Sequence, residues 1–562
     1  QHPRGLNNFV RTVSDPASPR YRDYATVAQL VNRFGAKPQT KKQVVRWFAA
    51  RGLHAKVIGS GTHAIVSMTG AQASRLLPPA DGAAASVTGL DRNIPAGLEG
   101  AVTGISVVSA APVVQPLAGP AVPTEAAASA SKEITAADFG KPYRSILLHS
   151  GTAGGCPAGS SGGEPGLPPF TPNQYLTAYG HSDLHAKGFK GQGQTVAVVE
   201  TGGFKHSDIA AFAKCFGIAK PPPIKVVPVE VPKPLPGEDE TTLDLSMLAV
   251  GAPKLDKIYV YEGLESLGGI ALTAGSALGT PGHQPDVISI SLGYCENELN
   301  GNMGGRDALD SIFAVAAGAG ISVLVSAGDQ GSTGCRTAEA GSEELTALPM
   351  RAVSLPASSP YVTAVGGTNL GLTPKNKIKV EVVWNNSVII PWGGGGGGSI
   401  ITPRTPWWQA GISSYGHGRK VPDIAALADI YPGYAFFCTA ASCKPERNVV
   451  YGWSKVGGTS AAAPLTAAGI ALVNQYAAKQ GQPPLGFLNP LLYDLGASAK
   501  SRASSFNDVT IGNNDIGIAL PPEAGGGVPV GCCQAKPGYD WASGWGSLKL
   551  PSFAKAAVAA GN

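Results

Sequence analysis

The chain of 562 residues is poor in charge, because Asp, Glu, Lys and Arg make up only 14% of it and the net charge is +5. No basic run stands out, which argues against a nucleic-acid partner. No apolar run approaches the roughly 20 residues that span a bilayer, so we expect no membrane segment. The sequence starts at Gln1 without a charged and apolar leader, and we expect that any signal peptide has been left out of this numbering.

The cysteines match no zinc or redox spacing. Eight are present, at positions 156, 215, 295, 335, 438, 443, 532 and 533. An even, scattered set is typical of disulfides in an exported protein, so we expect a secreted protein in which Cys438 pairs with Cys443. The sequence leaves the pairing of the other six open.

The length exceeds what one hydrophobic core supports, so we expect several domains. Residues 1–115 mix helical spacing (24–34 and 41–51) with a hairpin-like alternation (55–68), which predicts a small α/β unit with its own core. Residues 116–170 are rich in Ala, Ser, Gly and Pro, a composition typical of an exposed linker. Residues 171–562 form the expected large domain.

Strand and helix patterns alternate through the large domain. The β-branched runs predict strands at 194–200, 257–261, 287–291, 322–326 and 361–365, with helices between them. Alternation of this kind predicts an α/β fold with a parallel sheet flanked by helices. Functional groups in such sheets gather at the carboxyl ends of the strands.

One candidate nucleophile stands at the start of a predicted helix. The segment Gly457-Gly458-Thr459-Ser460 precedes a small, apolar stretch that extends to Asn474. The glycines allow a sharp turn, and the helix would place its positive end behind Ser460. A turn followed by an Ala-rich helix also suits plain packing, so this segment alone decides little.

Two carboxyls lie four residues apart, at Glu240 and Asp244. On a helix they share a face, and in a poorly solvated site they would share a proton at acidic pH. Such a pair could accept the proton of Ser460. The alternative is a solvated acidic helix start favoured by the helix dipole.

A third candidate, Asp329, follows a predicted strand in Ala327-Gly328-Asp329. At a strand's carboxyl end, a protonated carboxyl could donate a hydrogen bond to an oxyanion, whereas a carboxylate would repel it. Asp before Gly-rich sequence is also a common turn residue.

Together these three segments resemble the sedolisin family, the serine-carboxyl peptidases. The Ser460 segment resembles the serine segment of subtilisin-like peptidases, but the chain has no His-Gly-Thr-His run and no Asp-Thr-Gly or Asp-Ser-Gly after the first strand of the large domain, so the ordinary subtilisin triad is absent. The segments 355–368 and 421–426 fit the family as well, and residues 1–115 resemble the activation prodomain of prokumamolisin.

The resemblance implies a subtilisin-like catalytic domain and a role for each site residue. Ser460 is expected to be the nucleophile, Glu240 the general base and acid, Asp244 its orienting partner and Asp329 the oxyanion donor. Some members extend this chain of groups with a Glu after the first strand and a Trp. Glu200 matches the Glu, whereas Leu292 replaces the Trp. The Gly393–Gly398 run beside Trp392 could border the substrate groove or be a mobile loop.

The family also has a calcium site, which the resemblance places near the C-terminus. The expected ligands are the carboxylates of Asp508 and Asp540 and the carbonyls of Val509, Lys536 and Gly538. Oxygen ligands of this kind suit calcium. Without the resemblance, the same residues would be interpreted as turn residues.

From these features we expect a secreted, acid-acting serine-carboxyl endopeptidase made as a self-processing zymogen and binding one calcium ion. Its partners would be protein or peptide substrates and its own prodomain, with no nucleic acid or membrane, and we expect a monomer. The alternatives are a tripeptidyl peptidase of the same family and a catalytically dead binding protein. Retention of all four site residues argues against the last.

Overall fold

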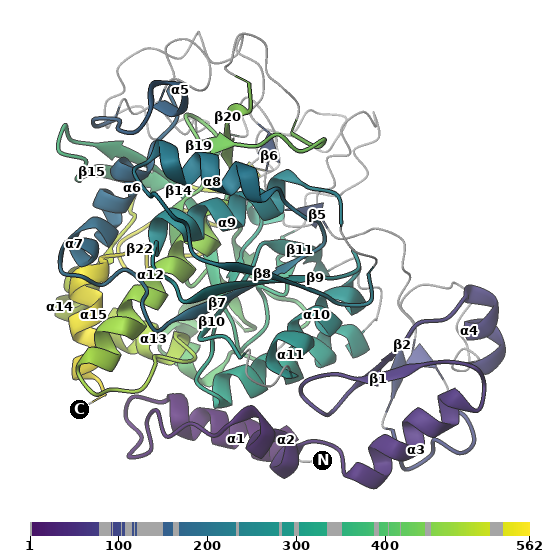
Figure 1. Ribbon diagram of the computed structural model, residues 1–562. Helices are drawn as coiled ribbons and strands as arrows, with labels where there is room; N and C mark the ends of the chain where they lie inside the picture. The colour runs from purple at the N-terminus through teal and green to yellow at the C-terminus, as the bar shows by residue number, and fades with distance from the viewer. Residues whose placement is uncertain are drawn as a thin grey trace.

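The structure is a computed structural model of the 562-residue chain (Figure 1). It describes residues 3–77, 91–92, 94–102, 104–106, 115–116, 119–120, 150–160, 168–231, 235–279, 284–296, 303–333, 351–386, 393–402, 404–415, 417–443, 451–516 and 532–561.

An eight-stranded sheet forms the centre of the large domain. The strand order is β15-β14-β12-β10-β7-β9-β8, with β18 also paired to β14. The pairing of β15 with β14 is antiparallel, and the other pairings in this sheet are parallel. The strands are β7 (Thr195–Glu200), β8 (Ile224–Pro228), β9 (Lys257–Glu262), β10 (Val287–Ile290), β12 (Ser322–Ser326), β14 (Thr363–Leu372), β15 (Ile378–Val383) and β18 (Ile424–Leu427).

Helices flank this sheet in two groups. Helix α12 (Thr459–Lys479) packs against α9 (Asp239–Gly251) and against several strands, and α9 also contacts α8 (His206–Cys215). Helix α10 (Leu267–Gly279) packs against α11 (Met303–Gly318) and against β7 and β9. The predicted α/β fold, a subtilisin-like parallel sheet flanked by helices, is therefore confirmed.

Shorter elements complete the large domain. They are α5 (Pro157–Ser160), α6 (Pro172–Tyr179), α7 (His181–Ala186), α13 (Asn489–Ala497), α14 (Ala499–Ser505), α15 (Leu550–Ala559), the 3₁₀ segments at Gly331–Thr333 and Trp407–Tyr415, β11 (Leu292–Cys295), β13 (Ser354–Leu355), β16 (Gly397–Gly398), β17 (Lys420–Val421), β19 (Tyr434–Phe437), β20 (Trp453–Gly457), β21 (Phe506–Asn507) and β22 (Ser547–Leu548).

The N-terminal unit contains both helices and short strands, as expected. Its elements are α1 (Pro3–Ser14), α2 (Val27–Phe34), α3 (Pro38–Ala49), β1 (Ala55–Val57), β2 (Ala64–Val66), α4 (Gly70–Leu76), β3 (Asp91–Arg92) and β4 (Ile105–Ser106). Strands β1 and β2 form the predicted antiparallel hairpin.

The expectation that this unit has its own core is only half right. Side chains around Val44 and Phe48 of α3 form a small separate core. The apolar faces of α1 and α2, in contrast, belong to the same core as the large domain. Both helices pack on α11, which lies directly above them in Figure 1.

Polar contacts extend the same junction. The Tyr24 hydroxyl donates to the Leu485 carbonyl at 2.7 Å, and a Cβ on Gly486 would lie 2.3 Å from that hydroxyl. The Arg22 guanidinium donates to the Ala557 carbonyl at 2.9 Å. The large domain is thus shaped to receive the N-terminal unit.

Part of the stretch expected to be an exposed linker is fixed to the large domain. The Ser150 hydroxyl donates to the Leu370 carbonyl at 3.0 Å, and the Thr152 amide donates to Asn376 Oδ1 at 2.7 Å. A disulfide then joins Cys156 to Cys215 of α8. Residues 150–160 therefore belong structurally to the large domain.

Two further disulfides lie in the described residues. Cys438 pairs with Cys443, which confirms the predicted local pair, and Cys532 pairs with its neighbour Cys533. Across the helices that the structure describes, none combines the length and apolar character needed to cross a membrane.

Candidate active site

Ser460 lies in the first turn of α12, where the sequence predicted it. Gly458, the residue before the helix, has φ of 116°, a conformation that favours glycine. Ser460 is fully buried, and its hydroxyl donates to the Ser291 carbonyl at 3.2 Å. The positive end of the helix thus presents the Ser460 hydroxyl. It lies next to the carboxyl ends of β10 and β12, through contacts with Ser291 and Gly328.

Glu240 and Asp244 lie one turn apart on α9, which packs against α12. Glu240 is 2% exposed and Asp244 is 0% exposed, so the solvated alternative is wrong. Both Asp244 oxygens accept from the Ser291 hydroxyl, at 2.8 and 3.0 Å. The Ser460 side chain lies within hydrogen-bonding reach of Glu240 and opposes the rise in the pKa of that carboxyl, so Glu240 is placed to accept the proton of Ser460.

Ser291 is a site residue that the sequence reasoning did not assign. Its hydroxyl contacts Asp244 and also the Ser460 carbonyl at 3.3 Å, while its own carbonyl accepts from the Ser460 hydroxyl. Ser291 therefore joins the helix of the nucleophile to the helix of the carboxyls. Its position directly after β10, at a strand's carboxyl end, was the signal that could have found it.

Glu200, the last residue of β7, extends the group of carboxyls. It is 1% exposed, it accepts from the Thr241 hydroxyl at 3.3 Å, and in protonated form it donates to Asp244. Leu292, which stands where some relatives have Trp, is buried in β11 and offers no polar group. The chain of polar contacts therefore runs from Asp244 to Glu200 and Thr241.

Asp329 follows β12 and is fully buried. Its Oδ1 accepts from both the amide and the hydroxyl of Thr459, each at 2.8 Å, so it is fixed to the residue before Ser460. Its Oδ2 has no hydrogen bond in the described part of the chain. If it carried a proton, this second oxygen could donate to a ligand next to Ser460.

The glycine run supports the Asp329 loop. The Gly393 amide donates to the Asp329 carbonyl at 2.8 Å, and a Cβ on Gly395 would lie 2.2 Å from the Ala327 carbonyl oxygen. Residues 393–398 are buried, so close packing explains these glycines better than a mobile loop does. Trp392 lies outside the described residues.

The four carboxyls are shifted toward their neutral forms. Burial raises the pKa of Asp329 to about 7 against the two Thr459 hydrogen bonds, and burial raises the pKa of Asp244 to about 7 against those from Ser291 and Glu200. Burial, then the charge of Asp244, raises the pKa of Glu240 well above its usual range, and the same two causes raise that of Glu200. No cation among the described residues pairs with them, so the site favours shared protons.

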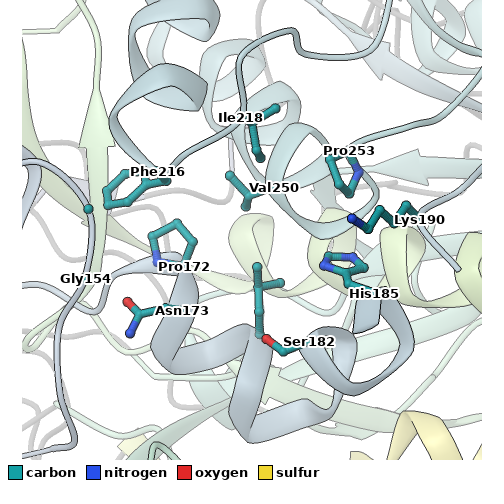
Figure 2. A pocket seen from close by; sticks show the side chains of 12 residues that line it. Gly154, Pro172, Asn173, Ser182, His185, Lys190, Phe216, Ile218, Val250 and Pro253 are labelled. Atoms are coloured by element: carbon teal, nitrogen blue, oxygen red, sulfur yellow. The ribbon is translucent and has the colours of Figure 1, made fainter. Parts of the chain in front are cut away.

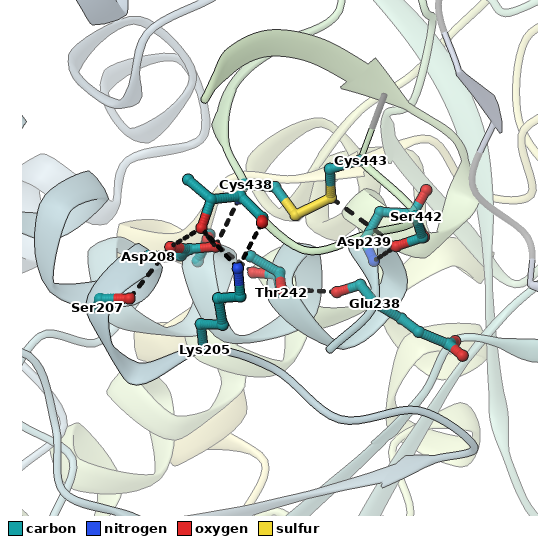
Figure 3. The surroundings of a disulfide bond; sticks show 11 residues. Lys205, Ser207, Asp208, Glu238, Asp239, Thr242, Cys438, Ser442 and Cys443 are labelled. Atoms are coloured by element: carbon teal, nitrogen blue, oxygen red, sulfur yellow. Dashed lines mark hydrogen bonds between the residues drawn. A yellow bond between two sulfur atoms is a disulfide. The ribbon is translucent and has the colours of Figure 1, made fainter. Parts of the chain in front are cut away.

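A disulfide-closed loop caps the helix that carries Glu240 (Figure 3). The loop between Cys438 and Cys443 places the Ser442 hydroxyl where it accepts from the Asp239 amide at 3.1 Å. Asp208 accepts from the Thr439 amide at 2.7 Å and holds the other end of the loop. Because Glu238 caps no amide of α9, the loop supplies the partner that the helix start needs.

The residues expected to bind calcium come together. The Gly538 amide donates to Asp508 Oδ2 at 2.8 Å, the Lys536 amide donates to Asp540 Oδ2 at 3.0 Å, and the Ser543 hydroxyl lies between Asp540 and the Val509 carbonyl. Asp508 Oδ1 is buried without a hydrogen bond in the described residues, and the other oxygen of this carboxylate lies 3.8 Å from Arg502 Nε. The oxygen-only set fits calcium.

No cluster of three or more His, Cys, Asp or Glu side chains that could hold a metal occurs in the described residues. The expected calcium set has only two carboxylates, so it depends on its three carbonyls. A cavity of about 300 Å³ lies elsewhere, at the far end of α9 near Val250, between His185 and Phe216 (Figure 2). It includes none of the candidate catalytic residues.

Comparisons with known proteins agree with this geometry. A sequence profile of the Subtilase family matches residues 246–485, and a profile of the Pro-kumamolisin activation domain matches residues 1–78. Kumamolisin of Bacillus sp. (strain MN-32) is 33% identical over 67% of this chain and 62% of its own length. Tripeptidyl-peptidase 1 of Mus musculus is 27% identical over 98% of this chain and 88% of its own length.

A solved structure gives the same result. It is the complex of Pseudomonas sedolisin, a serine-carboxyl proteinase, with pseudo-iodotyrostatin. The sedolisin chain is 27% identical in sequence to this chain and superposes on it with a TM-score of 0.56, and the match covers 72% of this chain and 98% of the sedolisin chain. The match to kumamolisin spans less than two thirds of that relative, whereas the match to sedolisin spans nearly all of it. From the fold, the site and these relatives together, the chain belongs to the sedolisin family of serine-carboxyl peptidases, with a prokumamolisin-like prodomain at its N-terminus.

Proposed function

We propose that this protein is a secreted, acid-acting endopeptidase that is made as a self-processing zymogen and cleaves peptide bonds with Ser460, Glu240 and Asp244. The observation that carries the proposal is the Ser291 bridge. One residue contacts the hydroxyl of Ser460 and both oxygens of Asp244, so the nucleophile and the carboxyl pair share one buried site.

In the proposed reaction, Ser460 Oγ attacks the substrate carbonyl carbon. Its hydroxyl hydrogen turns from the Ser291 carbonyl to Glu240, which accepts the proton and later gives it to the leaving amine. Asp244 orients Glu240 and shares its proton, with Glu200 behind it. Asp329 keeps its own proton and donates it in a hydrogen bond to the oxyanion.

An acidic working pH follows from this assignment. Asp329 has to be protonated, and the Glu240 and Asp244 pair has to hold one proton while Glu240 accepts another. Burial raises the pKa of these groups, so they keep protons that exposed carboxyls would lose. Activity should fall both at very low pH and toward neutrality.

Calcium is the second part of the proposal. Asp508 and Asp540, with the carbonyls of Val509, Lys536 and Gly538, would hold one ion that ties the chain near residue 508 to the chain near residue 540. Asp508 Oδ1, which is buried and has no hydrogen bond to any described residue, supports this assignment. The ion would stabilise the large domain and would take no part in bond cleavage.

A tripeptidyl peptidase is the second candidate, because tripeptidyl-peptidase 1 matches nearly the whole chain. The test is digestion of one denatured protein by the mature enzyme between pH 3 and pH 7, with the products sized. Peptides of mixed length support an endopeptidase, whereas a ladder of tripeptides supports the second candidate. An absence of products at every pH would contradict both.

A further inference from the structure

The cavity of about 300 Å³ near Val250 takes no part in the proposed reaction (Figure 2). Its walls come from α6, α7, the ends of α8 and α9, and residues 154–155. Glu240 and Val250 are ten residues apart on α9, so the cavity lies about 15 Å along the helix from the carboxyl pair. Its volume is at the lower end of the range for pockets that bind small ligands, roughly 300 to 1,000 Å³.

Two basic side chains stand on one wall of this cavity. Figure 2 shows the Lys190 ammonium next to the His185 ring. His185 Nε2 donates to the Gly251 carbonyl at 2.9 Å, so Nδ1 is the ring nitrogen that remains for a ligand. The described lining contains no Asp or Glu, and neither the Lys190 ammonium nor His185 Nδ1 has a hydrogen-bond or ion-pair partner in the part of the chain that the structure describes. Two cationic groups without a carboxylate favour an anion between them.

The charge on His185 depends on pH. Burial lowers the pKa of His185 against the hydrogen bond to the Gly251 carbonyl, and the charge of Lys190 lowers it further. The other titratable group that interacts with it among the described residues is His181, which burial keeps neutral by lowering its pKa to about 3. An anion in the cavity would offset the repulsion from Lys190 and favour the protonated form of His185.

The rest of the lining is mostly apolar, and Figure 2 shows Phe216 and Pro172 across the cavity from His185. A Cβ on Gly155, which has φ of 103°, would lie 2.4 Å from the Phe216 ring, and a Cβ on Gly154 would lie 2.9 Å from Asn173 Oδ1. The backbone therefore closes this side of the cavity without side chains. The apolar side chains that line the cavity are Pro172, Leu176, Phe216, Ile218, Val250 and Pro253.

Contacts around the cavity hold its walls in place. The Cys156–Cys215 disulfide fixes residues 154–155 beside the end of α8, and the Asn173 amide group donates to the Thr152 carbonyl at 2.8 Å. On the basic side, the Lys254 amide donates to the Lys190 carbonyl at 2.8 Å. The cavity is therefore formed before a ligand arrives, which lowers the entropy that binding costs.

We propose that this cavity is a second binding site, separate from the catalytic residues, for a carboxylate that carries an apolar body, such as the C-terminal residue of a short peptide. Lys190 and protonated His185 would hold the carboxylate, and the apolar lining would cover the body. Binding should be strongest between the pKa of the ligand's own carboxyl, about 3.5, and that of His185, because both partners are then charged. It should weaken as the pH rises through the pKa of His185, while Lys190 keeps part of it.

The test is calorimetric titration of the full-length Ser460→Ala protein, in which the proposed nucleophile is absent. The probes are N-acetyl-L-phenylalanine and its amide, N-acetyl-L-phenylalaninamide, which differ only in the carboxylate. At pH 5 we expect the acid to bind about tenfold or more tightly than the amide, and more tightly than it binds at pH 7.5. Equal affinities of acid and amide, or no binding of the acid at pH 5, would overturn the inference and leave the proposed function standing. 3-Phenylpropionate, titrated in the same way, distinguishes a peptide end from a simple organic acid.

Variants locate the bound probe. Lys190→Ala should weaken binding of the acid about tenfold or more, whereas Lys187→Ala, at an exposed lysine outside the cavity, is the matched control and should bind normally. His185→Gln keeps a donor for the Gly251 carbonyl but does not titrate, so it should remove most of the difference between pH 5 and pH 7.5. An unchanged Tm of each variant shows that the fold is intact. Binding that Lys190→Ala leaves unchanged would place the probe elsewhere and overturn the assigned site.

Discussion

At the scale of single residues, the site is a set of buried carboxyls whose pKa shifts involve no cation among the described residues. Asp329 shows the consequence most clearly, because one of its oxygens accepts two hydrogen bonds from Thr459 while the other has no partner in the part of the chain that the structure describes. A carboxyl held in this way can serve as a donor only while it is protonated. Burial keeps that proton by raising the pKa to about 7.

Asp329→Asn should keep a measurable rate and move the alkaline limb of the pH–rate profile to higher pH. The amide oxygen can replace Oδ1 as the Thr459 acceptor, and the amide nitrogen is a donor that does not titrate. The pH of the alkaline limb should rise to the value at which the Glu240 and Asp244 pair loses its shared proton. The measurement is kcat/KM from pH 3 to pH 8.

Asp329→Ala is the comparison for this prediction. It removes the donor, and loss of one oxyanion donor typically costs about 3 kcal/mol, so this variant should be far slower at every pH. If the Asn and Ala variants proved equally inactive over the whole range, Asp329 would not act as a neutral donor.

At the scale of elements, segments distant in the chain meet to hold the site and the large domain. The loop between Cys438 and Cys443 caps α9. The segments near residues 508 and 540 are hydrogen-bonded to each other, and the strand pair β21 and β22 also joins this part of the chain. The second of these meetings is the expected calcium site.

Chelator should lower the Tm of the full-length protein, and Asp540→Ala should remove that sensitivity. An ion bound only by the native state adds about 3 kcal/mol at a hundredfold excess over its Kd. Asp183→Ala, which removes an exposed carboxylate paired with Lys377, is the control and should stay sensitive. A wild-type melting curve unchanged by chelator would contradict the proposed calcium site.

The elements also show what the sequence could predict. β-branched runs such as 195–200 identified the parallel strands, and the four-residue spacing of Glu240 and Asp244 placed both on one face of α9. The position of Ser291 at a strand's carboxyl end was visible in the sequence, but its bridging contacts were not, because they depend on how α9 and α12 pack together. The two-residue strands β5 (Gln115–Pro116) and β6 (Gly119–Pro120) could not be predicted either, because they are too short to show a period. The burial of α1 against α11 is a contact between domains that helical spacing alone does not specify.

At the scale of the whole molecule, buried carboxyls link stability to pH. Glu381 lies far in sequence from the site, and it accepts from Tyr179, Thr368 and Ser547. Burial outweighs these hydrogen bonds and raises its pKa from 4.5 to about 7. Between those two values the native state keeps a proton that the unfolded state loses, so stability falls as the pH rises through this window.

The Ser460→Ala zymogen should therefore be more stable at pH 4 than at pH 7, with about 1.4 kcal/mol lost per pH unit for each such group. Glu381→Gln removes one titrating group and should make the dependence of the unfolding free energy on pH shallower. Asp183→Asn, at an exposed carboxyl, should leave it unchanged. Denaturant unfolding from pH 4 to pH 7 measures the slopes, and identical slopes for the Ser460→Ala zymogen with and without Glu381→Gln would contradict the prediction.

The most direct test of the account is the activity of Ser460→Ala beside Thr466→Ala. Thr466 lies on the same helix, and among the described residues its hydroxyl donates only to the Ala462 carbonyl one turn away, so its loss controls for a change in α12. Peptide cleavage and removal of the prodomain would both be measured at acidic pH on purified protein. We predict that Ser460→Ala loses both, by about 10⁶-fold for cleavage, while Thr466→Ala keeps both. A Ser460→Ala protein that still cleaved peptides and released its own prodomain would show that Ser460 is not the nucleophile.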